Sequence, residues 1–389
     1  MKLIIEPIEP DFDNIGFIKI CNVIILDHND KQLSCQKLWV KSVMNDIDSA
    51  SNDCGMFLIM ILMDAMKLSA DIIVKGAISK DLIINLMEFQ CAWEKWLPKI
   101  YKKVKIVADI TFWEPMNDLD KYIVPFTGGV DSTFTVFENF SSPSYKRNIE
   151  RCVFVHGFDI PLKYESQYKS YYNLASSTLD SLNIQLTSIS TNFREISMVD
   201  WEHCFATALV GVLNIFKGVS AGCLIGSSRP YDNLYFPWGS NPVTDHLLSD
   251  KNFKVVHDGS GYTRTEKISF ISDWVEGSKN LRVCWEGEYL NRNCGKCEKC
   301  LRTQVGFIAT GNLIPKSFPK VDVVNLIVLL RLRNKPIYMA WVSLLKSPYL
   351  NENEKKIVFS IKKMLLINSL KNSKLIFLLR KLKSYYKLL

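Results

Sequence analysis

The sequence lacks any long hydrophobic run. Its longest uninterrupted apolar stretch covers only residues 56–63 and ends at Asp64, whereas a membrane-spanning helix needs about 20 apolar residues. The apolar start of the chain, residues 3–5, meets Glu6 before the core of a secretion signal can form. The sequence therefore predicts a cytoplasmic protein.

Glycine and proline are also scarce, with 18 and 14 residues among 389, so we expect no long flexible linker. Hydrophobic residues make up 48% of the chain and charged residues 23%. This balance excludes a disordered or collagen-like chain. At about 100–200 residues per domain, the length predicts two domains with an additional segment.

Acidic residues are missing from residues 355–389, which hold ten lysines and arginines. Subtracting these ten charges from the net charge of +8 leaves −2 for residues 1–354, and so nearly neutral a body argues against a broad nucleic-acid groove. Apolar residues recur in this tail at helical spacing, at Ile357, Ile361, Met364, Leu365, Leu375, Leu378, Leu379 and Leu382. The tail is either a helix packed on the body, which is the commoner case, or a basic amphipathic helix that contacts a membrane surface or a partner protein.

The order of apolar and turn-forming segments predicts an α/β protein with four parts. These are an N-terminal mixed α/β domain (1–115), a nucleotide-binding domain (116–280), a cysteine-rich segment (281–320) and a basic helical region (321–389). In the first part we expect strands and turns up to about residue 50, helices at 54–68 and about 80–97, and strands at 71–76 and 104–108. In the second part we expect strands at 122–126, 151–155, 185–189 and 222–226, with helices from 132, at 165–183 and at 201–217. Strands that alternate with helices of this length predict a parallel sheet covered by helices on both faces.

A glycine-rich segment follows the first strand of that second part. It consists of Thr127, Gly128, Gly129, Val130, Asp131 and Ser132. The two glycines allow a tight turn, and the amides of the following helix N-terminus point at an anion. The Walker spacing and its lysine are absent, as is the dinucleotide-binding fingerprint. In this strand–loop–helix setting we interpret the segment as a phosphate-binding loop.

The segment resembles the S-G-G-x-D-S pyrophosphate loop of the N-type ATP pyrophosphatases, the PP-loop (adenine nucleotide alpha hydrolase-like) superfamily, with Thr127 in place of the first serine. The resemblance implies that the loop binds ATP with Mg²⁺ and that Asp131 and Ser132 are catalytic. It implies further nucleotide contacts from His156, Gly157, Gly226, Ser227 and Ser228, which follow the second and fourth strands. Arg264 and Lys267, in a stretch similar to the T-K-x-E-I segment of the family, are the other catalytic candidates.

Four of the 11 cysteines, Cys284, Cys294, Cys297 and Cys300, fall within 17 residues. In a reducing compartment such a cluster indicates a metal site rather than disulfides. Cysteines separated by two residues place both thiolates on one ion, and four thiolates form the closed site that structural Zn²⁺ prefers. An iron–sulfur cluster is the other metal centre that this spacing allows.

This stretch resembles the zinc site of the 7-cyano-7-deazaguanine synthases, the QueC-like branch of the PP-loop superfamily, with a first gap longer by one residue. Those enzymes use ATP and ammonia to convert a carboxylate to a nitrile. The resemblance covers about residues 120–310, so it implies a QueC-like relative: an enzyme that adenylates a small carboxylate or amide, releases pyrophosphate and transfers nitrogen.

Two alternatives stay open. The adenylate is instead thiolated by a sulfur donor, for which Cys204 and Cys223 are weak candidates because lone cysteines are usually core residues. Otherwise the fold is a non-catalytic module that binds nucleotide and zinc. The aromatic loop at residues 235–246 is either a packed surface loop or a cover over the ligand, with Trp238 stacking on a heterocycle and Asp245 or His246 positioning a nucleophile.

Overall fold

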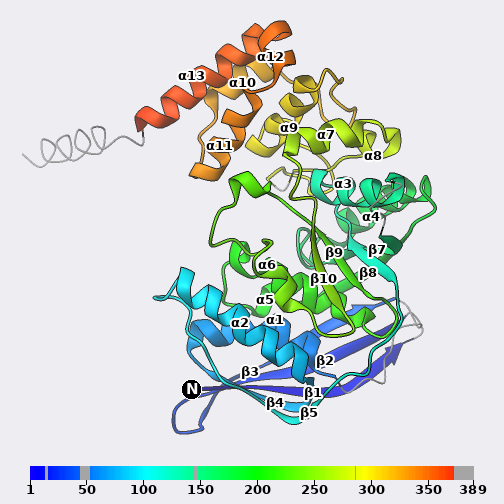
Figure 1. Cartoon of the computed structure of the whole chain (residues 1–389), viewed down its shortest axis with the longest axis vertical. Helices are drawn as coiled ribbons and strands as arrows, with labels where there is room; N and C mark the ends of the chain where they lie inside the picture. Colours follow the sequence, from blue (N-terminus) through cyan, green and yellow to red (C-terminus); the bar gives the residue numbers. More distant parts are fainter. Residues whose placement is uncertain (14–15, 44–52, 143–146, 285, 372–389) are drawn as a thin grey trace, which may run out of the picture. The chain divides into compact units, whose positions relative to one another are not determined.

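The fold is described from a computed structural model, which places residues 1–13, 16–43, 53–142, 147–284 and 286–371 (Figure 1). The chain divides into two compact units, Met1–Thr263 and Arg264–Leu389. The first unit carries the sheet, and the second is helical.

The strands of the first unit are β1 (Lys2–Asp13), β2 (Gly16–Leu26), β3 (Gln32–Ser42), β4 (Asp71–Ser79), β5 (Ile106–Phe112), β6 (Lys121–Pro125), β7 (Asn148–His156), β8 (Gln185–Thr191), β9 (Gly222–Gly226) and β10 (Lys254–Asp258). Its helices are α1 (Gly55–Leu68), α2 (Lys80–Trp96), α3 (Val130–Ser141), α4 (Glu165–Asp180), α5 (Phe193–Ile196) and α6 (Trp201–Leu213), with 3₁₀ turns η1 (Asn214–Phe216), η2 (Tyr231–Asn233) and η3 (Asp245–Leu248). The predicted alternation of helices and strands is confirmed, with end points shifted by a few residues.

Within the described part of the chain, ten strands form one sheet in the order β10-β9-β6-β7-β8-β3-β2-β1-β4-β5. Most neighbouring pairs are parallel, which confirms the predicted α/β class; the exceptions are the pairs β1–β2, β2–β3 and β3–β8, which are antiparallel. The order of β6 to β10 reverses at β6: the chain moves outward through β7 and β8, then returns to place β9 and β10 on the other side of β6. Because crossovers between parallel strands are right-handed, α3 and α4 cover one face of these strands and α6 covers the other.

The boundary predicted at residue 115 lies inside this sheet. Val40 and Ser42 of β3 pair with Thr191 and Ile189 of β8, so strands from both sides of the boundary belong to one layer. The pairing of β3 with β8 covers two strand edges that separate sheets would expose. The sequence did not predict it because the hydrophobic pattern of a strand does not reveal which partner strand it pairs with. The division between the two compact units falls between Thr263 and Arg264, whereas the sequence predicts boundaries after residues 280 and 320.

Helix α1 joins the two halves of the first unit. The apolar run of residues 56–63 is buried on every side of this helix, as expected for a helix without a polar face. Figure 1 shows α1 and α2 lying over the N-terminal strands, with α6 beside α1. A Cβ built on Gly211 of α6 would lie 2.2 Å from Met60 Cγ, so the two helices pack closely at this glycine.

Asp64 is a buried carboxylate in α1 and accepts hydrogen bonds from Ser197 Oγ (2.9 Å) and Met198 N (2.7 Å). Burial raises the pKa of Asp64 to about 6, above the value of about 3.9 in an unfolded chain. The folded state therefore binds the Asp64 proton more tightly than the unfolded chain does. Protonated Asp64 stabilises the folded state below pH 4, and this contribution is lost as the pH rises to about 6.

Asp64→Asn removes this titrating group. Between pH 4 and pH 7, we expect the unfolding free energy of the wild type to fall by about 3 kcal/mol relative to that of Asp64→Asn, at about 1.36 kcal/mol for each pKa unit. Urea unfolding of both proteins across this range measures the difference. Asp118→Asn, the same substitution at an exposed position, is the matched control. A difference that does not change with pH would contradict the expectation.

The second unit contains α7 (Arg264–Ser272), α8 (Val275–Lys279), α9 (Glu298–Ala309), α10 (Val323–Leu329), α11 (Lys335–Leu344), α12 (Pro348–Asn353) and α13 (Lys355–Lys371). Its core includes Leu301, Trp341 and Ile361. The predicted apolar positions 357, 361, 364 and 365 of the tail are all buried in this core, while the four lysines of residues 355–363 are exposed. For this part of the tail, packing on the body is confirmed; the predicted positions 375, 378, 379 and 382 lie outside the described residues.

Candidate functional site

The glycine-rich loop connects β6 to α3. Gly128 has φ +64°, a left-handed conformation, and Gly129 is the extended residue that begins α3 at Val130. The helix thus starts two residues before the predicted Ser132, which instead lies in its first turn and donates a hydrogen bond from Oγ to the Gly129 carbonyl (3.2 Å). The residue at the N-cap position is Gly129, which has no side chain to cap the helix. A helix N-terminus presents backbone amides that suit an anion such as a phosphate group.

Helix α4 holds the loop from one side. A Cβ built on Gly128 would lie 1.7 Å from Tyr171 Oη, so only glycine fits this position. One turn earlier in α4, the Tyr168 ring stacks on the imidazole of His156, with ring centres 4.1 Å apart. Gly128, after β6, and His156, at the end of β7, therefore both contact the same face of α4.

His156 and Gly157 lie at the carboxyl end of β7, as predicted. His156 is buried, its Nε2 lies 3.2 Å from the Pro161 carbonyl, and burial lowers its pKa. Gly157 has φ +103°, and a Cβ there would lie 2.0 Å from the Thr191 carbonyl. Both residues are held in a tight turn, in which the histidine is neutral at pH 7.

The end of β9 meets the first turn of α3. A Cβ built on Gly226 would lie 2.8 Å from the Asp131 carbonyl oxygen and 3.1 Å from Thr135 Oγ1. The backbone of Ser227, which is buried, donates a hydrogen bond to the Asp258 carbonyl (2.7 Å). The structure thus brings the predicted residues of the two loops together. Parallel α/β sheets bind ligands beyond the carboxyl ends of their strands, where the strand order reverses, and β6 and β9 flank that point here.

The aromatic loop at residues 235–246 is attached beside Ser228. The Trp238 indole donates a hydrogen bond to Ser228 Oγ (3.1 Å) and lies under the Arg229 guanidinium, 5.4 Å from ring centre to Cζ. Asp245 is fully buried and accepts hydrogen bonds from Ser240 Oγ (2.6 Å) and His257 Nδ1 (2.7 Å). These contacts give Asp245 a structural partner in His257, which the sequence pattern did not indicate.

Arg264 and Lys267 belong to the second unit. They lie in α7, where Lys267 is buried and Arg264 Nη2 contacts Thr303 Oγ1 of α9 at 3.5 Å. The Arg264 contact contributes to the packing of α7 on α9. The catalytic role of both residues stays a prediction.

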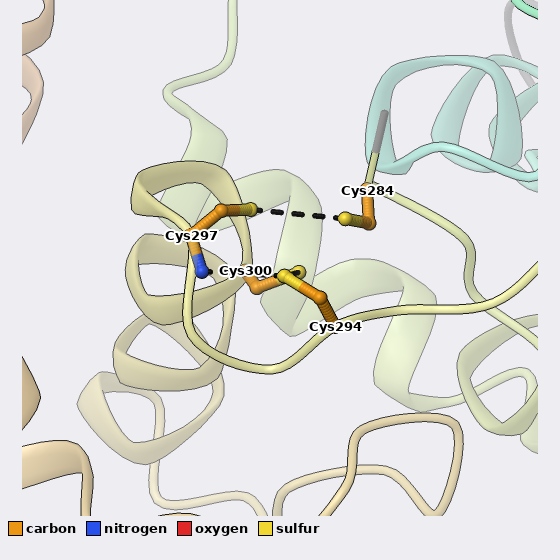
Figure 2. Close-up of side chains that lie close together, drawn as sticks. All are labelled: Cys284, Cys294, Cys297 and Cys300. Carbon is orange, nitrogen blue, oxygen red and sulfur yellow. Dashed lines mark hydrogen bonds between the residues drawn. The ribbon is translucent and has the colours of Figure 1, made fainter. Parts of the chain in front are cut away.

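The four clustered cysteines come together, and their sulfur atoms all lie within 4.8 Å of one another (Figure 2). Cys284 Sγ is 3.8 Å from Cys297 Sγ, and Cys294 Sγ is 3.9 Å from Cys300 Sγ. Hydrogen bonds with Cys284 and Cys297 raise the pKa of the Cys300 thiol well above its ordinary value. Metal ligands must be deprotonated, and a metal ion between the sulfurs would take the place of these protons, so the group is suited to hold one.

Two polar side chains that the sequence reading missed support this cluster. Asn293 Oδ1 accepts hydrogen bonds from the backbone amides of Val283 (2.8 Å) and Cys284 (3.2 Å). Gln304 Nε2 donates to the Gly295 carbonyl (2.7 Å), and Gly295 has φ +76° in the turn between the cysteines. Since an Asn and a Gln near cysteines carry no recognisable spacing, only the fold shows that they position the ligands.

Within the described residues, no helix is both long enough and apolar enough to cross a membrane. Comparison of the chain with protein-family models, curated proteins and solved structures gives no match.

Proposed function

We propose that the protein is an ATP-dependent enzyme of the PP-loop type, QueC-like, which adenylates a small carboxylate or amide and then transfers nitrogen to it. The observation that carries this proposal is the meeting of two loops at the point where the strand order reverses. There the N-terminus of α3 lies against Gly226 at the end of β9.

The proposed chemistry needs a site for the departing pyrophosphate. For a carboxylate, one substrate oxygen attacks the α-phosphorus of ATP, the bond to the bridging oxygen breaks, and pyrophosphate leaves. Ammonia then attacks the carbonyl carbon of the adenylate, AMP leaves with the electrons of the C–O bond, and a proton is released. The amides at the start of α3 and the hydroxyls of Thr127 and Ser132 are placed to bind the phosphates, which stabilises the charge that develops on pyrophosphate.

Asp131 supplies an oxygen ligand for Mg²⁺ beside these phosphates. It is half-buried in the first turn of α3, and Mg²⁺ binds through one or two carboxylates together with substrate phosphates. When bound, the ion neutralises phosphate charge.

Zn²⁺ is the metal that we propose for the four cysteines. Four sulfurs at about 2.3 Å from one tetrahedral zinc ion lie about 3.8 Å apart, and the closest pairs here are 3.8 and 3.9 Å apart. Sulfurs this close share one ion, whereas a cluster spreads them over several iron atoms. Four protein ligands leave no open position, which favours a structural role.

Nitrogen transfer is favoured over sulfur transfer by the state of the candidate cysteines. Burial raises the pKa of Cys204 to about 12 and also raises the pKa of Cys223, which is fully buried. A sulfur carrier reacts as an exposed thiolate, so neither residue is suited to that role. Sulfur transfer would then need an external sulfide.

The test is nucleotide binding and turnover in the wild type and Asp131→Ala, with Asp118→Ala as a matched control at an exposed position. We expect calorimetry to show binding of a non-hydrolysable ATP analogue with Mg²⁺, weakened at least tenfold by Asp131→Ala alone. Pyrophosphate release is then assayed with heterocyclic carboxylates and ammonium. A folded, metal-loaded wild type that binds no nucleotide would overturn the proposal in favour of a non-catalytic module.

A further inference from the structure

A second candidate site lies in the first unit, at the opposite end of β9 from the phosphate loop. There a pocket of about 200 Å³ has a polar wall that includes Asp53, Glu114, Asn214 and Lys217. Its other wall includes Met56, Phe112 and Ile215. A space of this size holds several water molecules or one small organic molecule.

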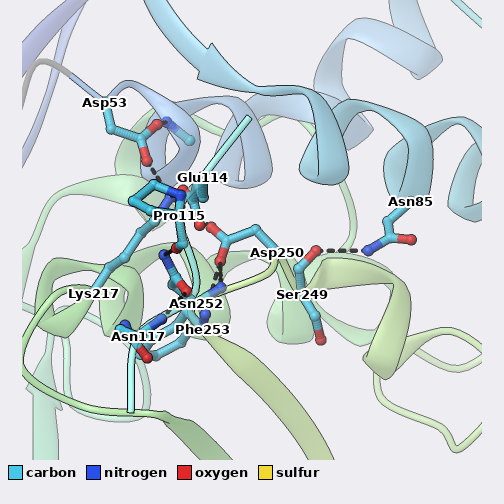
Figure 3. A network of polar contacts seen from close by, with 11 residues as sticks. Asp53, Asn85, Glu114, Pro115, Asn117, Lys217, Ser249, Asp250, Asn252 and Phe253 are labelled. Atoms are coloured by element: carbon cyan, nitrogen blue, oxygen red, sulfur yellow. Dashed lines mark hydrogen bonds and ion pairs between the residues drawn. The ribbon is translucent and has the colours of Figure 1, made fainter. Parts of the chain in front are cut away.

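Lys217 forms the centre of the polar wall, where the chain turns from η1 toward β9 (Figure 3). Its ammonium group forms ion pairs with Asp53, Glu114 and Asp250, the last at 2.7 Å. An ammonium group has three N–H donors, so these three carboxylates occupy all the donors of Lys217. Lys217 can therefore satisfy no further acceptor in the pocket.

Two buried polar groups that line the pocket are left over. Glu114 is 5% exposed and its Oε2 has no hydrogen-bond partner. Asn214 is 7% exposed; its backbone N–H donates to the Val210 carbonyl, but no described protein group bonds its side-chain amide. A buried polar group without a partner costs free energy, so Glu114 Oε2 calls for a ligand with hydrogen-bond donors, and the Asn214 side chain lines the same pocket.

The charges around the pocket are also unbalanced. Two carboxylates, Asp53 and Glu114, and two lysines, Lys19 and Lys217, are the charged residues that line the described pocket. Asp250, which is buried and ion-paired with Lys217, adds a third carboxylate, so the group carries one excess negative charge. Burial and the neighbouring Asp250 raise the pKa of Glu114, which reflects this excess of negative charge. One additional positive charge would balance the group.

We propose that this pocket binds a small organic ammonium ion, whose charged group donates hydrogen bonds to Glu114 Oε2 and the Asn214 side-chain oxygen. The apolar wall of Met56, Phe112 and Ile215 contacts the carbon skeleton. A divalent cation suits the pocket less well, because Lys217 already lies between the carboxylates and a hard cation requires about six oxygen ligands.

This site is separate from the phosphate loop. Lys217 precedes β9 and Gly226 ends it, and five residues of a strand span about 17 Å. The inference therefore does not rest on the proposed enzymatic function.

The experiment titrates the full-length, metal-loaded protein with butylammonium chloride and, as a neutral isostere, 1-butanol, by calorimetry at pH 7. We expect saturable binding of butylammonium and none of butanol. Asn214→Leu and Glu114→Gln should each weaken the binding tenfold or more, since each removes one acceptor of a charged hydrogen bond. Asn22→Leu, whose amide bonds Glu6 at the surface, is the matched control and should bind as the wild type does.

Circular dichroism verifies that each variant is folded. Asn214→Leu breaks no ion pair, so its result remains interpretable if Glu114→Gln fails to fold. A folded wild type that does not bind butylammonium, or binding that both variants leave unchanged, would overturn the proposal. Binding of Mn²⁺ without binding of the amine would overturn it as well and assign the carboxylates to a metal ion.

Discussion

Replacing Cys300 with serine is expected to unfold the second unit and to release its metal. Cys300 is buried in the first turn of α9 and is one of four sulfurs within 4.8 Å of one another. Structural Zn²⁺ binding contributes about 10–16 kcal/mol in small domains, which is comparable to the whole stability of a domain, about 5–15 kcal/mol. Loss of one ligand therefore removes more free energy than packing of the helical core can replace.

Hydrogen exchange of residues 298–309 and 323–370, together with elemental analysis, measures this effect. Wild-type protein should contain about one zinc per chain, and Cys300→Ser should contain almost none and exchange freely in both segments. Cys35→Ser is the matched control because Cys35 is an exposed cysteine of β3, and such a change alters stability by less than about 0.5 kcal/mol. Treating the wild type with a chelator separates loss of metal from loss of the buried side chain. Full protection after chelation would contradict the prediction.

Replacing Gly128 with alanine is expected to lower nucleotide affinity and pyrophosphate release about 100-fold, the size of effect that a displacement of about 1 Å produces in a catalytic site. The left-handed backbone of Gly128 costs about 1–2 kcal/mol for a residue with a Cβ. The added Cβ would also lie 1.7 Å from Tyr171 Oη, so the loop must move away from α4. Calorimetry with the ATP analogue and the pyrophosphate assay measure the loss.

The double variant Gly128→Ala/Tyr171→Phe tests whether the contact with α4 is the cause. Removing the hydroxyl leaves Cζ, at 3.0 Å, as the nearest atom to the new Cβ, so part of the affinity should return. Gly261→Ala is the control, because a Cβ at Gly261 meets nothing within 4 Å. If Gly128→Ala behaves like this control, the loop does not bind phosphate.

The sequence was sufficient to predict the local elements and the cysteine cluster. The strand at 222–226 and the helix at 54–68 are found where predicted, because a buried strand and a buried helix each have a distinct apolar run. Cys294, Cys297 and Cys300 meet because two-residue gaps at a helix N-terminus place them together, and Cys284 joins them across a gap of nine residues. Both are properties of short segments.

Long-range features were not predictable in the same way. The pairing of β3 with β8 joins residues about 150 positions apart, and neither strand carries a signal for its partner. The contact of Gly128 with Tyr171 depends on how α4 packs, which no motif specifies. The three carboxylates around Lys217 come from separate parts of the first unit, so their convergence is visible only in the fold.

The β3–β8 pairing also affects how the chain folds during synthesis. The Trp39 amide bonds the Asn192 side chain, 153 residues later. At about 5–20 residues per second, a ribosome needs roughly 8–30 s to make that interval. During this time β3 is an open sheet edge, which is the kind of surface that recruits strands from other chains. Sequence-distant contacts of this kind slow folding, so we expect the edge of the N-terminal strands to stay exposed until β8 has been made.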